Sequence, residues 1–173
     1  MSNEKTSIQQ NDIATVGEQY LTFLLADEEY AVEILKVQEI KSWGPVTPVP
    51  CSPDYVLGVI NLRGAIVPVV DLRLLFKLPE ADYTSTTAVV IVRSMLGGQL
   101  RVVGLVVDKV AEVYHLGADN IQQSTSISSN LGGQFFSGLG HIEEKLVILI
   151  DLDRLVAVGL DELDAAEAEA LQL

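Results

Sequence analysis

The sequence predicts a mainly β protein made of two related small units. Three observations support this fold class: short apolar runs with a period of two, turn signals at regular spacing, and an internal repeat. Runs of this length and spacing are typical of β-barrels and sandwiches. With 173 residues, the chain is long enough for one ordinary domain or two very small ones.

Three hairpins are expected along the chain, each made of two apolar runs around a short turn. The paired runs are 19–25 with 29–34, 59–62 with 65–70, and 88–92 with 100–107. In the second hairpin the turn is Arg63-Gly64, where the glycine is free to adopt a positive φ. A last buried strand is expected over residues 146–150.

An internal repeat relates the two halves of this β region. The segment 36–40 recurs at 109–113, an offset of 73 residues, and the segments 58–59 and 71–72 recur 80 residues further along. We therefore expect two pseudo-symmetric copies of one β unit, roughly one per half of the chain and dividing near residue 83. Because each copy is too small for a large core, the two are expected to share a third apolar layer.

Positions that recur in both copies are explained by the fold. Asp71 and Asp151 each end a strand and are expected to accept hydrogen bonds at the start of a one-turn helix. Gly58 and Gly138 are expected to end short helical turns, where glycine is favoured. Residues shared by the two copies are therefore weaker candidates for a specific contact than residues found in only one.

The turn at Arg63 is the first candidate for a specific contact. In the second copy Glu143-Glu144 stands where the first has Arg63-Gly64, so the fold does not require the latter pair. Arg63 is one of few cations in an acidic chain, and its forked guanidinium suits a carboxylate on a partner. A solvated turn cation without a partner is the alternative interpretation.

Composition and charge exclude several classes of function. Eleven Lys and Arg residues against 24 Asp and Glu residues give a net charge of −13, which opposes binding to nucleic acid or to an anionic membrane. No apolar run approaches the roughly 18 residues of a membrane-spanning helix, so no membrane insertion is expected. Cys51 is the only cysteine and cannot form an internal disulfide, which fits a cytoplasmic protein.

The sequence contains no constellation typical of catalysis or metal binding. Its two histidines, His115 and His141, lack the spacing of zinc ligands, and no phosphate-binding loop is present. We therefore expect no catalytic residues, no metal and no cofactor.

The two ends of the chain differ from the β region. Residues 1–17 are polar and lack hydrophobic periodicity, so a flexible leader is expected. Over residues 157–173 we expect an acidic amphipathic helix, which packs on the parent domain or docks on another protein. Its apolar stripe consists of Leu160, Leu163, Ala166, Ala170 and Leu173.

Two long motifs resemble the CheW family of bacterial chemotaxis coupling proteins. They cover residues 27–40 and 58–73, and two shorter motifs at 102–108 and 137–140 follow in the same order. The resemblance places a CheW-like domain over residues 18–156. It implies two five-stranded SH3-like barrels packed together, with short helical turns and a carboxyl-terminal helix.

The resemblance also implies partners and contact residues. It implies a non-catalytic cytoplasmic scaffold between the regulatory domain of the histidine kinase CheA and the cytoplasmic tip of a methyl-accepting chemotaxis receptor. The receptor tip is expected in an apolar groove between the barrels, and the kinase domain is expected to pack barrel to barrel. The residues implied for these two surfaces are Val37, Glu39, Gly58, Arg63, Val113 and Gly138.

Two other functions stay open on the sequence. One is a CheW-like adaptor of a non-flagellar chemosensory system, such as surface motility. The other belongs to a different class, a small-molecule-binding regulatory barrel. That function needs polar groups that converge in the cleft, whereas the polar positions of this chain lie mainly at turns.

Overall fold

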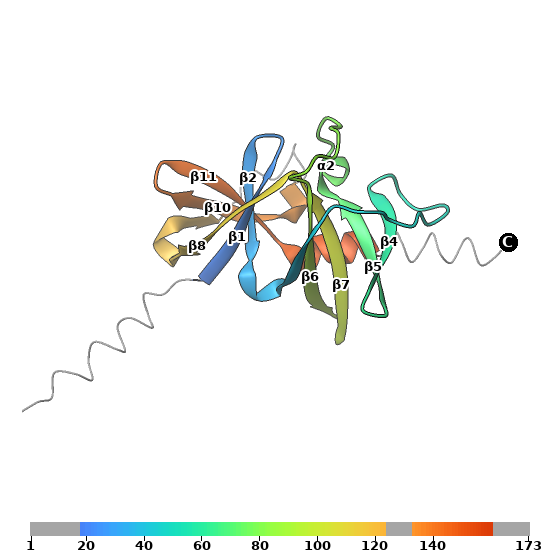
Figure 1. Cartoon of the computed structure of the whole chain (residues 1–173). Coiled ribbons are helices and arrows are strands. Elements are labelled where there is room, and N and C mark those ends of the chain that lie inside the picture. The colour runs from blue at the N-terminus through green and yellow to red at the C-terminus, as the bar shows by residue number, and fades with distance from the viewer. Residues whose placement is uncertain (1–17, 124–132, 161–173) are drawn as a thin grey trace, which may run out of the picture.

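Two β-sheets contain most of the residues that the computed structural model describes, which are 18–123 and 133–160 (Figure 1). The five-stranded sheet, here the first barrel, has the order β3-β6-β7-β5-β4. Its strands are β3 (Val37–Ser42), β4 (Val56–Leu62), β5 (Ala65–Asp71), β6 (Ala88–Leu96) and β7 (Gln99–Val107). The six-stranded sheet, here the second barrel, has the order β8-β1-β2-β11-β10-β9. Its strands are β1 (Glu18–Leu25), β2 (Glu28–Glu33), β8 (Lys109–Leu116), β9 (Ile121–Gln123), β10 (Phe136–Ile142) and β11 (Lys145–Ile150).

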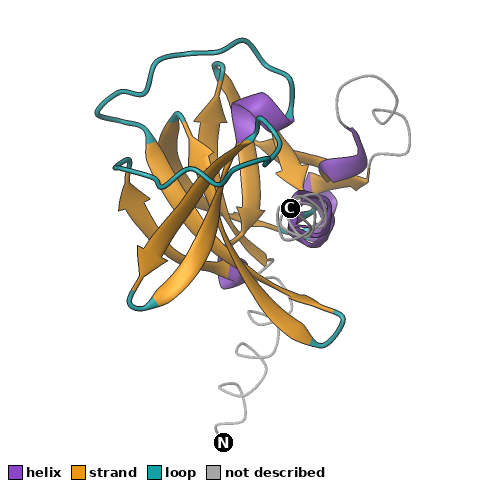
Figure 2. Ribbon diagram, turned by 90° about the vertical axis from the view of Figure 1, so that its right-hand side faces the viewer, coloured by secondary structure: helices purple, strands orange, loops and turns teal. Residues whose placement is uncertain are grey.

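Short helical segments join the strands. They are η1 (Ile34–Lys36), α2 (Leu72–Leu75), η2 (Ala118–Asn120) and η3 (Gly133–Phe135). A longer helix covers residues 152–160 without a break, and Figure 2 shows it nearly end-on beside the strands. It is longer than the single turn expected there, and the expected leader and the rest of the expected tail lie outside the described residues. No helix in the described ranges is long and apolar enough to span a bilayer.

The expected fold class and hairpins are confirmed. The three hairpins are β1–β2, β4–β5 and β6–β7, and the last expected strand is β11. All three turns, Ala26-Asp27, Arg63-Gly64 and Gly97-Gly98, have positive φ at both central residues, as type I′ hairpin turns require. The second barrel has one strand more than expected, the short β9.

The internal repeat is confirmed strand by strand. In both barrels the second strand of a hairpin pairs in parallel with the strand that leads into the repeated aspartate, β7 with β5 and β2 with β11. The amide of Asp71 donates to the carbonyl of Tyr55 at 2.8 Å, and the amide of Asp151 donates to the carbonyl of Phe135 at 2.7 Å. Burial also recurs, because residues 141–150 repeat the pattern of residues 61–70 position by position.

The two barrels do not divide the chain near residue 83. The β1–β2 hairpin opens the described chain but pairs with β8 and β11 of the second half. The β6–β7 hairpin lies beyond residue 83 but pairs with β3 and β5 of the first half. Each copy therefore contributes its first hairpin to the barrel of the other. A sequence repeat reports which strands are alike and carries no information on which strands pair.

Three apolar clusters fill the protein, one inside each barrel and one shared. The cluster of the first barrel contains Leu62, Val67, Val69, Val89, Ile91 and Val106. The cluster of the second contains Tyr20, Ala31, Leu116, Ile142, Val147 and Leu149. The shared cluster includes Phe23, Val32, Val90, Leu105, Leu152 and Leu155. The expected third apolar layer is therefore present, and alternate residues of β6 are buried on opposite faces of that strand.

Gly58 and Gly138 lie inside strands β4 and β10, not at the ends of helical turns. At Gly58, whose φ is +145°, a Cβ atom would lie 2.0 Å from the carbonyl oxygen of Thr47. At Gly138 it would lie 2.6 Å from the carbonyl oxygen of Gln122. The close approach of a neighbouring backbone, rather than a helix end, requires both glycines. The expectation was wrong because glycine is typical of both situations.

The two expected helix caps are confirmed. The Asp71 side chain accepts a hydrogen bond from the amide of Arg73 at 2.9 Å, at the start of α2. The Asp151 side chain accepts one from the amide of Arg154 at 3.2 Å, at the start of the last helix. Each aspartate therefore satisfies a backbone donor that the first turn of a helix leaves free.

Candidate functional site

The tip of the β4–β5 hairpin is a tight turn with an arginine in an uncommon conformation. Arg63 and Gly64 have φ of 51° and 88°, the values of a two-residue type I′ turn. The amide of Gly64 donates to Oδ1 of Asn61 at 2.8 Å, so Asn61 holds the turn in place. At the positions of Asn61, Arg63 and Gly64 the second copy has different residue types, His141, Glu143 and Glu144.

Arg63 extends from this tip into solvent and forms one ion pair. Its side chain is 77% exposed, and Nη2 lies 2.9 Å from Oε2 of Glu39 on β3. An exposed pair of this kind contributes about 0–1 kcal/mol to folding. The guanidinium has five N–H donors, so most of its hydrogen-bonding capacity remains available to a partner. The structure thus brings together two of the six contact residues implied by the sequence.

The other four implied contact residues lie apart from this pair. Val37 begins β3 and is half-buried against the shared cluster. Val113 is 47% exposed on β8, in the other barrel. Gly58 and Gly138 are buried and present no side chain, so a partner can read them only through the backbone that they shape.

A groove of about 460 Å³ lies beside Arg63. It is lined by Gln38, Val59, Leu62, Arg63, Ala65, Ile66, Val67, Pro68, Leu100, Arg101, Val102 and Leu160. Its rim is apolar, since Ile66 is 64% exposed and Leu100 is 57% exposed. Every lining residue except Leu160 belongs to the first barrel, so this is not the groove between the barrels that the resemblance implied.

A smaller hollow of about 240 Å³ adjoins the groove, and Leu100 lines both. Leu35 of η1 and Met95 of β6 line this hollow and are largely exposed. Together with Ile66 and Leu100 they form an exposed apolar band, a feature typical of surfaces that bind other proteins. Sequence reasoning missed the band for two reasons. Ile66 and Leu100 lie in hydrophobic runs that were expected to be buried, whereas Leu35 and Met95 lie outside the expected runs, so nothing in the sequence linked the four residues.

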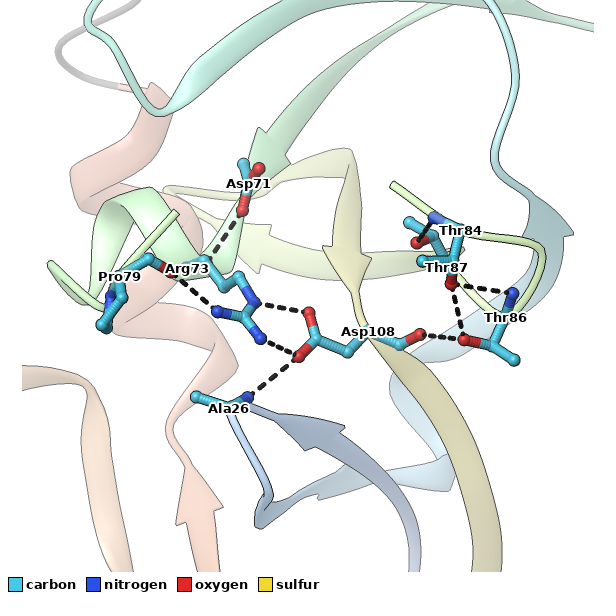
Figure 3. Close-up of polar contacts among 8 residues, drawn as sticks. All are labelled: Ala26, Asp71, Arg73, Pro79, Thr84, Thr86, Thr87 and Asp108. Carbon is cyan, nitrogen blue, oxygen red and sulfur yellow. Dashed lines mark hydrogen bonds and ion pairs between the residues drawn. The ribbon is translucent and has the colours of Figure 1, made fainter. Parts of the chain in front are cut away.

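An arginine clasp joins the two barrels, formed by Arg73, Asp108 and the amide of Ala26 (Figure 3). The Arg73 guanidinium donates from Nε to Oδ1 of Asp108 at 2.7 Å and from Nη2 to Oδ2 at 2.5 Å. Oδ2 also accepts a hydrogen bond from the Ala26 amide at 2.9 Å. Burial alone would raise the pKa of Asp108, but these hydrogen bonds and the charge of Arg73 hold it below its usual value. The clasp ties the β1–β2 turn of the second barrel to α2 and the end of β7.

A second clasp, here the aspartate clasp, is formed by Asp153, Lys36 and Ser94, and its Asp153 is the counterpart of Arg73 at the 80-residue offset. The hydroxyl of Ser94 donates to Asp153, and Nζ of Lys36 donates to it at 3.2 Å. The hydrogen bond from Ser94 is the main reason why the pKa of Asp153 is lowered, although partial burial opposes it. The clasp fixes the last helix against β6 and η1.

The exposed features that the described residues present are contact surfaces. Within residues 18–123 and 133–160 no group of three or more His, Cys, Asp or Glu side chains is placed to hold a metal ion. The charged groups of the arginine clasp bind each other and the Ala26 amide. Among the described residues, the Arg63 turn with its groove and the apolar band is accessible to a partner.

Comparison with known proteins decides the family. The CheW-like domain family matches residues 19–159 of this chain. The chain belongs to the CheW family. A chemotaxis protein CheW of Klebsiella aerogenes is 41% identical over 143 residues, which are 83% of this chain and 84% of the relative. A probable chemotaxis protein CheW of Rhizobium etli is 36% identical over 155 residues, 90% of this chain and 94% of the relative.

A solved structure agrees with the CheW family in fold. The crystal structure of scaffolding protein TtCheW from Thermoanaerobacter tengcongensis gives a TM-score of 0.72 at 30% identity. The match covers 80% of this chain and 92% of that chain. The CheW resemblance read from the motifs at 27–40 and 58–73 is therefore confirmed.

Proposed function

We propose that this CheW-family chain is a non-catalytic cytoplasmic scaffold that couples a methyl-accepting chemotaxis receptor to the regulatory domain of the kinase CheA. The match of the CheW-like domain to residues 19–159 is the observation that carries the proposal. It is supported by accessible contact surfaces around Arg63 and the apolar band, which suit a protein that holds two others together.

The scaffold acts through geometry. Simultaneous weak contacts with receptor and kinase raise the effective concentration of one near the other. The signal of the receptor then shifts a conformational equilibrium of the kinase through contacts that differ between its two states. The rigid relation of the two barrels, held by the shared cluster and the two clasps, lets a shift at one contact reach the other.

The contact surfaces are assigned residue by residue. Arg63 offers a charged, forked donor at the tip of the first barrel, and Glu39 orients it. Val37 and Val113 contribute apolar contacts on β3 and β8. Gly58 and Gly138 act indirectly, by allowing the backbone path of the strands that carry the surfaces.

Reconstituted kinase assays test this function. Receptor fragments, CheA and this protein are mixed, and kinase autophosphorylation is measured with and without receptor ligand. We expect receptor control of the kinase only when the protein is present. Arg63→Glu should weaken binding to receptor or kinase at least tenfold, since a repelling carboxylate replaces the donor.

Lys145→Glu is the matched control for Arg63→Glu. It makes the same change in net charge at the equivalent hairpin of the second barrel, where the side chain is also exposed. We expect it to leave coupling within about twofold of wild type. Receptor control of the kinase in the absence of the protein would contradict the coupling function. Equal loss of binding in both variants would contradict the assignment of Arg63.

A further inference from the structure

The described part of the last helix reaches the rim of the groove beside Arg63 at Leu160. Asp153 in its first turn is held by Ser94 and Lys36, which fixes where the helix lies. At its described end, Leu160 is 6% exposed and lines the groove. Residues 161–173 therefore begin directly beside the groove.

We propose that the acidic segment 161–173 docks back onto this groove and covers it in the free protein. The proposal concerns a contact within one chain, so it does not depend on the coupling function. In this state the side chains of Arg63, Arg101, Ile66 and Leu100 face the segment rather than water.

Charge complementarity supports this occupant. Arg101 and Ser94 are cross-strand partners, so their side chains leave the β6–β7 hairpin on the same face, the face on which Asp153 lies. Arg101 lines the groove and has no ion pair within the described residues. The segment has no Lys or Arg, and its carboxylates are Asp161, Glu162, Asp164, Glu167 and Glu169.

The apolar composition and the reach of the segment also match the groove. Ile66 and Leu100 line it and are mostly exposed, and the segment supplies Leu163 and Leu173 on its expected apolar stripe. Asp164 is four residues beyond Leu160, and four extended residues span about 14 Å. The segment can therefore reach along a groove whose rim contains Leu160, the residue that directly precedes it.

Docking within one chain is favoured over docking on a second copy. A tethered segment acts at an effective concentration in the millimolar range, far above that of a second copy in solution. Two copies that each carry a net charge of −13 also repel each other. A partner that uses the Arg63 surface has to displace the segment first, which lowers the apparent affinity of that partner.

Paramagnetic relaxation enhancement in the full chain tests the proposal. A nitroxide is attached to Gln172→Cys in a Cys51→Ser background, and amide peak intensities are compared with the reduced label. We expect at least a twofold loss of intensity at Ile66, Leu100 and Arg101. The loss should shrink when ionic strength rises from about 0.1 M to about 1 M, because the Debye length falls from about 10 Å to about 3 Å.

Charge variants sharpen the measurement. Arg101→Glu should abolish the effect and Arg101→Gln should reduce it, while Lys145→Glu, on the distant β11, should leave it unchanged. Unaltered amide shifts in the second barrel verify that each variant is folded. The proposal is overturned if the intensity loss persists in Arg101→Glu. It is also overturned if the spin-labelled protein with the natural Arg101 shows no intensity loss at the groove. A mixed sample tests docking between chains: spin-labelled protein without ¹⁵N is combined with ¹⁵N-enriched protein that carries no spin label. Loss of peak intensity in this sample also overturns the proposal, because the occupant is then a second copy.

Discussion

The two barrels share a backbone plan but present opposite charges at equivalent tips. In the first barrel Arg63 pairs with Glu39. In the second, Glu143 and Glu112 occupy the corresponding positions. The pKa of Tyr114 is raised there, first by its hydrogen bond to Glu112, then by desolvation, and further by the negative charges of Glu112, Glu29 and Glu143. One fold therefore tolerates either an ion pair or two carboxylates at this place. Folding therefore does not fix the charge of the side chains at the tip, and these side chains can be used to bind a partner.

The clasps give a second contrast between the copies. Arg73 and Asp153 are equivalent residues, and each reaches the residue that precedes β8 or β3, Asp108 or Lys36. The polarity is reversed, since the helix carries the cation in one copy and the anion in the other. Each pairing is therefore specific, because an exchange of partners would place Arg73 beside Lys36 and Asp153 beside Asp108.

The largest effect is expected at the two glycines of strands β4 and β10. Gly58→Ala should lower the free energy of unfolding by about 3–4 kcal/mol, because a Cβ there meets a carbonyl and φ is positive. Gly138→Ala should cost less, about 1–3 kcal/mol, because the contact is longer and φ is unstrained. Chemical denaturation measures both, and Gly44→Ala, where no atom lies within 4 Å, is the near-neutral control. Equal costs at Gly58 and Gly138 would contradict the distinction.

The arginine clasp should contribute more to the free energy of unfolding than the aspartate clasp. Arg73→Ala breaks a bidentate pair whose side chains are 17% and 32% exposed, and should cost about 2–3 kcal/mol. Asp153→Ala breaks a more exposed pair and should cost about 1 kcal/mol, as removal of one hydrogen-bond partner does. Unfolding midpoints in urea measure both costs. The double variant Arg73→Asp with Asp108→Arg should recover part of the loss, and no recovery would show that charge pairing is not the cause.

Much of the fold was predictable because its signals are local. The hairpins follow from alternation around short turns, and the caps at Asp71 and Asp151 follow from residue type at strand ends. The exchange of hairpins between barrels was not predictable, because it depends on parallel pairing of β2 with β11 and of β7 with β5. Such pairing joins residues far apart in the chain and leaves no local pattern.

The candidate site was predictable only in part, for a related reason. Arg63 stood out because the second copy lacks it, and comparison of repeats needs only the sequence. The groove beside it did not, since Leu100 and Leu160 meet there from distant segments. Arg101 carried no signal, because an arginine on a strand is ordinarily a solvated side chain. Its relation to the last helix appears only when Ser94 is seen to contact Asp153.

Acid should weaken the arginine clasp in a defined pH range. The pKa of Asp108 lies below its usual value of 3.8 in the folded protein. Its contribution is therefore complete above the unfolded pKa and is lost as pH falls through the folded pKa. Urea midpoints should be steady from about pH 7 to pH 5 and fall below about pH 4. Asp108→Asn should be less stable at pH 7 and should show a shallower fall, and an unchanged slope would exclude Asp108 as a source of the acid sensitivity.

The smallest effect is expected where the two barrels differ most in charge. Arg63→Glu converts the tip of the first barrel to the two-carboxylate arrangement that the second already has, so it should cost no more than about 1 kcal/mol. Glu143→Arg makes the converse change and should be neutral or stabilising by about 0.5 kcal/mol, since it places a cation near Glu112 and reduces the net charge. Thermal melting measures both. If Arg63→Glu melts far earlier, Arg63 is a structural ion-pair residue, and the half-buried Val37 becomes the better candidate for partner contact.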